Sequence, residues 1–183
     1  KDAGLAHGKI TGLLKALFGI ALSRGGSAQA MLRAARRCGP SYHAIVESLP
    51  QQPVITPDET GWRIGGRLAW LHVFVAGPLT CYAIDAHRGV EVAQRLLGLD
   101  YAGALIHDGW APYDRFWQAH HQTCLAHLLR RCRELLETAT RGAVRFPRQV
   151  QALLQDALDL RDRHAVGQVS DHGLAVARGR LEQ

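Results

Sequence analysis

The hydrophobic pattern of this chain changes its period once, and this change constrains the fold more than any other feature. From Lys9 to about Val46, apolar residues recur at steps of three and four, which is typical of helices. After a linker at 51–53 the pattern becomes extended, with glycine-bearing turns between short apolar runs. Strands are expected at 54–56, 68–76, 79–84, 102–106 and 121–123, and helices at 89–98 and 124–138. This order predicts an α/β fold.

The regions on either side of the expected sheet are predicted to be helical. Before the linker, glycine-bearing breaks at 25–26 and 39–40 predict short helices over 9–18, 28–37 and 42–49, with Ser27 as the cap of the second. Two short helices around such turns resemble a helix-turn-helix that binds DNA, although a plain helical hairpin with a solvated basic face fits equally well. The candidate DNA contacts on the second helix are Arg33, Arg36 and Arg37. Three domains follow from this reading, at 1–52, 53–140 and 141–183.

Composition narrows the class of protein. The 183 residues are 47% hydrophobic, which excludes a disordered tail, and four cysteines are too few for a disulfide-rich scaffold. That cysteine count favours a reducing, cytoplasmic location. The net charge of +6 favours a polyanionic partner. The longest uncharged stretch, at 68–84, is interrupted by Gly77-Pro78, so it predicts two strands and a turn and no membrane span.

Two aspartates follow apolar strands and are the candidate catalytic residues. Asp58 is expected to close the first strand, and Asp108 to close the strand at 102–106. In this strand order the two strands can be central neighbours, which would bring both carboxylates to one edge of the sheet. A divalent cation such as Mg²⁺ would relieve their repulsion, and two such ions can support phosphodiester chemistry. For either aspartate alone, a simple turn residue is the better interpretation; the pair favours function. Glu59 is expected to point to the opposite face and is not counted as a ligand.

A second candidate motif, of uncertain role, is formed by Cys124 and His127, which share one face of the expected helix. With His121 they could bind zinc, but a packed cysteine beside a hydrogen-bonded histidine fits the spacing better. Arg130 and Arg131 follow on the same helix. They are candidate contacts to a phosphate backbone, or simply part of a solvated charged face.

Three segments resemble the transposases of the insertion-sequence-66 family. They are Asp-Glu-Thr-Gly-Trp at 58–62, His-Asp-Gly-Trp-Ala-Pro-Tyr at 107–113 and Cys-Leu-Ala-His-Leu-Leu-Arg at 124–130. The resemblance implies a ribonuclease-H-like core of mixed sheet and flanking helices. It also implies a DDE triad that holds two Mg²⁺ or Mn²⁺ ions and cleaves and joins DNA at transposon ends. By motif match, Asp58 and Asp108 are its first two carboxylates. DNA is the implied partner, and a homo-oligomer is left open.

The chain departs from the family at the third carboxylate. The Asn-Asn-x-Ala-Glu-Arg-like segment that carries it in the family has no counterpart here, so we expect a fragment that ends within a helical insertion. A chain with two carboxylates is expected to show no appreciable transposition by itself. Two alternatives stay open: a catalytically inactive DNA-binding or regulatory remnant, and a metal-dependent nuclease of the same fold with another third ligand.

Overall fold

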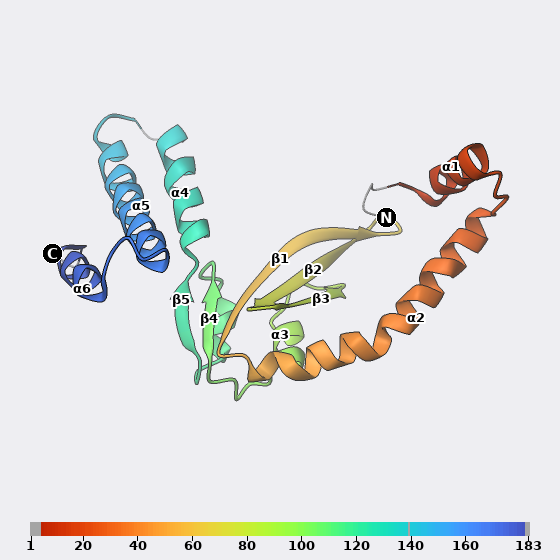
Figure 1. Cartoon of the computed structure of the whole chain (residues 1–183), viewed down its shortest axis with the longest axis horizontal. Helices are drawn as coiled ribbons and strands as arrows, with labels where there is room; N and C mark the ends of the chain where they lie inside the picture. The colour runs from red at the N-terminus through yellow and green to blue at the C-terminus, as the bar shows by residue number, and fades with distance from the viewer. Residues whose placement is uncertain (1–4, 139, 182–183) are drawn as a thin grey trace.

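The computed structural model describes residues 5–138 and 140–181, which form one sheet with helices around it (Figure 1). The helices are α1 (His7–Phe18), α2 (Arg24–Ser48), α3 (Glu91–Leu97), α4 (Leu125–Thr138), α5 (Arg145–Ala165) and α6 (Asp171–Leu181). Short 3-10 helices are η1 (Leu49–Gln51), η2 (Ala111–Arg115) and η3 (Arg141–Val144). The strands are β1 (Val54–Ile64), β2 (Arg67–Ala76), β3 (Leu79–Asp85), β4 (Ala104–His107) and β5 (His120–Thr123).

The five strands form a mixed sheet in the order β3-β2-β1-β4-β5. The hairpins join β1 to β2 and β2 to β3 in antiparallel fashion, whereas β1 pairs with β4, and β4 with β5, in parallel. The α/β prediction is therefore confirmed, and so is the prediction that the first and fourth strands are neighbours. This mixed order is consistent with a ribonuclease-H-like arrangement.

The core lies between the sheet and the short helices that follow β3 and β4. Ile55, Phe74 and Leu105 project from three neighbouring strands and have no exposed surface. Buried side chains of α3, including Val92, and Phe116 beyond η2 belong to the same cluster. Burial of such side chains provides about 1.5–3 kcal/mol each. The packed centre thus lies where β1 and β4 meet, and it gives both strands a rigid base.

The first helical region differs from the prediction, because neither expected break occurs. One helix, α2, runs from Arg24 to Ser48, and Ser23, not Ser27, caps it by accepting a hydrogen bond from the Gly26 amide. Pro40 lies inside α2. Proline has no backbone N–H, so Pro40 cannot donate the helical hydrogen bond to the Arg36 carbonyl. Both residues are exposed, so water can donate to that carbonyl instead. In Figure 1, α2 follows a curved path away from the sheet, and α1 lies at its far end.

The first strand is longer than predicted. It was expected to end by Asp58, but β1 continues to Ile64 because β2 pairs with it over Thr56–Ile64, and a turn at Gly65-Gly66 closes the hairpin. Polar residues and a glycine in this stretch conceal its extended conformation in the sequence. Pro57, which cannot donate to a ladder, lies beyond the last residue that pairs with β4. Within the described ranges, no helix is both long and apolar enough to cross a bilayer.

Candidate active site

The register of β1 and β4 brings the two aspartates to the same level of the sheet. Val54 pairs with Ala104, and Ile55 with Leu105. Asp58 and Asp108 each follow the first of these pairs by four residues. Since side chains alternate along a strand, Asp58 lies on the same face of β1 as Val54. Asp108 directly follows the end of β4, as predicted, whereas Asp58 lies within β1 and does not close it.

Each aspartate has one oxygen bound to a nearby backbone amide. The Asp58 Oδ1 atom accepts a hydrogen bond of 2.9 Å from the Glu59 amide, and the Asp108 Oδ1 atom accepts one of 2.9 Å from the Trp110 amide. The turn that makes the second bond possible passes through Gly109, whose φ is +89°. The Asp58 side chain is half-exposed. Neither hydrogen bond uses the Oδ2 atom, and solvent reaches the Asp58 carboxylate.

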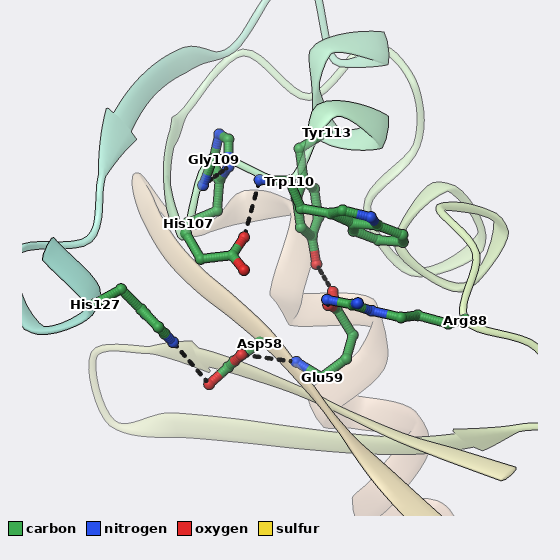
Figure 2. A network of polar contacts seen from close by, with 9 residues as sticks. Asp58, Glu59, Arg88, His107, Gly109, Trp110, Tyr113 and His127 are labelled. Atoms are coloured by element: carbon green, nitrogen blue, oxygen red, sulfur yellow. Dashed lines mark hydrogen bonds and ion pairs between the residues drawn. The ribbon is translucent and has the colours of Figure 1, made fainter. Parts of the chain in front are cut away.

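The Cys124-x-x-His127 motif is connected to this site through its histidine. The Cys124 amide donates a 2.7 Å hydrogen bond to the His107 carbonyl, which fixes the start of α4 at the end of β4. His127 lies one turn later, and its Nε2 atom is 3.9 Å from the Asp58 Oδ2 atom (Figure 2). Its Nδ1 atom is buried and makes no hydrogen bond within the described part of the chain. Sequence analysis had not connected His127 with Asp58, because only the fold brings α4 beside β1.

The zinc alternative finds no support. Residues 5–138 and 140–181 contain no group of three or more His, Cys, Asp and Glu side chains that could hold a metal ion. His121 is instead part of a histidine chain. The Gly109 amide donates to His107 Nδ1, so His107 carries its proton on Nε2 and donates to His121 Nδ1 at 3.0 Å. His121 Nε2 then donates to the Phe116 carbonyl at 3.0 Å. Burial lowers the pKa of His107, which favours this neutral form.

A buried polar group beside the aspartates was missed by sequence analysis. Glu59 accepts a hydrogen bond from the Tyr113 hydroxyl and lies 3.5 Å from Arg88 (Figure 2). Burial raises the pKa of Tyr113, and the hydrogen bond to Glu59 and the charges of Glu59, Asp108 and Asp58 raise it further. Glu59 and Tyr113 belong to the motifs that carry the family resemblance, which is the signal that could have identified them; no sequence signal identifies Arg88.

The structure places the candidate DNA-binding arginines in two separate regions. Arg33, Arg36 and Arg37 are exposed in the middle of α2, five to nine residues before Tyr42, whose hydroxyl donates to the Tyr82 carbonyl of β3. Arg130 and Arg131 are exposed near the start of α4, three and four residues after His127. This spacing places them on the helix face that His127 shares.

The mixed five-stranded sheet with flanking helices defines the chain as an α/β protein, with Asp58 in β1 and Asp108 directly after the neighbouring β4. The model of the family described as Transposase IS66 family matches residues 3–178. The chain therefore belongs to this family of transposases, as the three sequence motifs had predicted. A comparison with curated proteins found no match.

Proposed function

We propose that Asp58 and Asp108 of this transposase hold divalent metal ions, Mg²⁺ or Mn²⁺, for the cleavage and joining of DNA strands. DDE transposases as a class use such ions. The observation that carries the proposal for this chain is the parallel β1–β4 register, in which Val54 pairs with Ala104 four residues before each aspartate. Two carboxylates that converge at the ends of these neighbouring strands would repel each other unless a cation lay between them.

The donor set fits a hard cation. Each aspartate keeps one oxygen on a backbone amide, which orients the carboxylate and leaves the other oxygen available. Mg²⁺ prefers such oxygen ligands and needs few of them from protein. A bound ion would act as a Lewis acid on the scissile phosphate and would lower the pKa of an attacking water or 3′-hydroxyl. His127, 3.9 Å from Asp58, is placed to orient that carboxylate.

A third carboxylate does not join the pair among the residues that the structure describes. Glu59 is the nearest in sequence, but its oxygens bind Tyr113 and Arg88. Metal affinity and the orientation of a metal should both be weaker with two carboxylates than with three. We therefore propose that this chain by itself carries out no appreciable strand transfer.

The DNA partner is supported by the distribution of charge. Residues 3–46 carry six of the 22 basic side chains and none of the 16 acidic ones, so the remaining 16 basic and 16 acidic side chains cancel. The whole excess of +6 therefore belongs to the segment that forms α1 and most of α2. Because α2 extends away from the sheet, this basic arm can contact a phosphate backbone apart from the aspartates.

Mn²⁺ binding, measured by titration calorimetry, tests the metal proposal. Asp58→Asn and Asp108→Asn retain an oxygen for the local amide bond but lose the charge, so each should weaken binding at least tenfold without unfolding the chain. Asp156→Asn, on the exposed side of α5, removes the same charge elsewhere and should have no effect. Equal affinity in wild type and Asp108→Asn would place any metal elsewhere and refute the proposal.

Strand transfer on transposon-end DNA tests the activity proposed for the isolated chain. We expect no product with Mg²⁺ or Mn²⁺. Product that Asp108→Asn abolishes would show that the two carboxylates are sufficient. The charged arm also favours a second function, that of a DNA-binding or regulatory protein without catalysis. DNA binding with no Mn²⁺ binding would select this second function.

A further inference from the structure

The backbone does not by itself hold Asp58 and Asp108 at a fixed distance. The β1–β4 ladder has its last pair at Ile55 and Leu105, three residues before the aspartates. Beyond this pair, β1 continues along β2 as a hairpin, and the chain after β4 enters the turn at Gly109. Two strands that part in this way would let the carboxylates move relative to each other. Some other contact must connect the two segments if a metal is to be held between them.

A side-chain hydrogen bond connects them directly. Glu59 is next to Asp58 on β1, and Tyr113 lies in η2, five residues after Asp108. The Tyr113 hydroxyl donates to the Glu59 Oε1 atom. Both side chains are enclosed, with Glu59 3% exposed and Tyr113 2% exposed. A hydrogen bond to a carboxylate in such a dry position is costly to break, because the acceptor cannot turn to water instead.

Arg88 approaches the second carboxylate oxygen of Glu59. Its guanidinium lies 3.5 Å from the Glu59 Oε2 atom. It also lies over two rings, with its central carbon 4.8 Å from the Trp110 ring centre and 5.2 Å from that of Trp70. The Trp110 amide in turn donates to Asp108. A continuous set of contacts therefore runs from Asp58 through Glu59, Arg88 and Trp110 to Asp108.

We propose that Glu59, Arg88, Trp110 and Tyr113 form a clamp that fixes the spacing of Asp58 and Asp108, with Glu59 as a positioning residue and not a metal ligand. The inference rests on the proposed function, since it assigns a role within that site. Glu59 is unsuited to a metal because a cation and a hydroxyl already occupy its oxygens. It is suited to positioning because it is the β1 residue next to Asp58 that reaches the segment carrying Asp108.

Tyr113→Phe is the central test, because it removes one hydroxyl without changing any charge. Hydrogen exchange of the Glu59 and Trp110 amides, which bind the two aspartates, reports on the clamp without a metal. We expect both amides to exchange faster relative to the Phe74 amide in the core, and Mn²⁺ to bind about tenfold more weakly or worse. Tyr101→Phe is the matched control. Tyr101 is also buried, and its hydroxyl contacts the Gln52 and Ala104 carbonyls, where β1 and β4 begin and away from the aspartates, so neither measurement should change.

The outcomes separate this inference from the proposed function. Unchanged exchange of both amides in Tyr113→Phe would overturn the clamp, whether or not the wild type binds Mn²⁺. Faster exchange with unaltered Mn²⁺ affinity would overturn the positioning role alone. A wild type that does not bind Mn²⁺ would overturn the proposed function, and with it the positioning role.

A second variant covers the case in which Tyr113→Phe does not fold. Glu59→Gln keeps an oxygen for the Tyr113 hydroxyl but removes the charge that faces Arg88. It should speed exchange of the Trp110 amide, because Arg88 would lose the charged partner that holds its guanidinium against the Trp110 ring. Glu91→Gln, which removes a carboxylate from the start of α3, is its control. Equal exchange in Glu59→Gln and Glu91→Gln would overturn the clamp.

Discussion

Replacing Arg88 by alanine should destabilise the protein by about 2–4 kcal/mol. Two cation–π contacts contribute about 0.5–1 kcal/mol each at a partly exposed site. The Arg88 side chain is 37% exposed, so its direct attraction to Glu59 is screened and adds about 1 kcal/mol or less. The remaining cost is that Glu59, 3% exposed, keeps its charge without a cation. That cost lies below the 3–5 kcal/mol typical of a fully buried pair, because water can enter where Arg88 had been.

Urea unfolding at neutral pH measures this free energy, with Arg88→Lys and Arg161→Ala as comparisons. Arg88→Lys keeps the charge but loses the flat group that stacks between the two tryptophans, so it should lie between wild type and Arg88→Ala. Arg161 pairs with Asp162 at 2.6 Å, closer than Arg88 to Glu59, but both partners are 66% exposed. Its removal should cost less than about 1 kcal/mol. An equal loss in Arg88→Ala and Arg161→Ala would refute the reasoning that burial, not distance, determines the effect.

Two further predictions concern DNA binding and pH. Replacing Arg33, Arg36 and Arg37 of α2 by glutamine should make the slope of log affinity against log salt less negative by up to about three. The control removes three exposed arginines of α5, and an equal change of slope there would show that only net charge matters; these are Arg148, Arg161 and Arg163. Because the pKa of His107 is lowered in the folded state, the unfolded chain takes up its proton first as the pH falls. Stability should be complete above the unfolded pKa of about 6.5 and decline below it. His107→Asn, which keeps an acceptor for the Gly109 amide, should reduce this decline in thermal unfolding; an unchanged decline would contradict the assignment.

Local patterns predicted the central part of the fold well. The apolar run at 102–106 supplies most of β4, with Leu105 fully buried, and the strand order makes β1 and β4 neighbours, as expected. The predictions of where elements end are wrong in α2 and in β1. The glycines and proline of α2 predict breaks, but the helix passes through them because its exposed backbone can bond to water. Likewise, β1 passes Asp58 because β2 provides a partner along its whole outer half.

The residues of the candidate site also fall into two groups: those that the sequence could identify and those that only the fold brings together. The sequence predicts both aspartates as site residues because each follows an apolar run and lies in one of the family motifs. The contact of His127 with Asp58 was not predictable, because it depends on where α4 packs after β5. Arg88 had no signal either, since a single arginine in a loop becomes significant only when two tryptophans and a buried carboxylate surround it.

The sequence by itself determined the alternation of helix and strand, the family and the two aspartates, because these depend on residue order and short motifs. The tertiary structure decided which side chains meet. The ladder between β1 and β4 ends before the aspartates, so backbone hydrogen bonds do not set their environment. Side chains from β1, η2, α4 and the loop before α3 set it instead. Contacts between segments so distant in the chain form only when the core brings them together, and no local pattern encodes them.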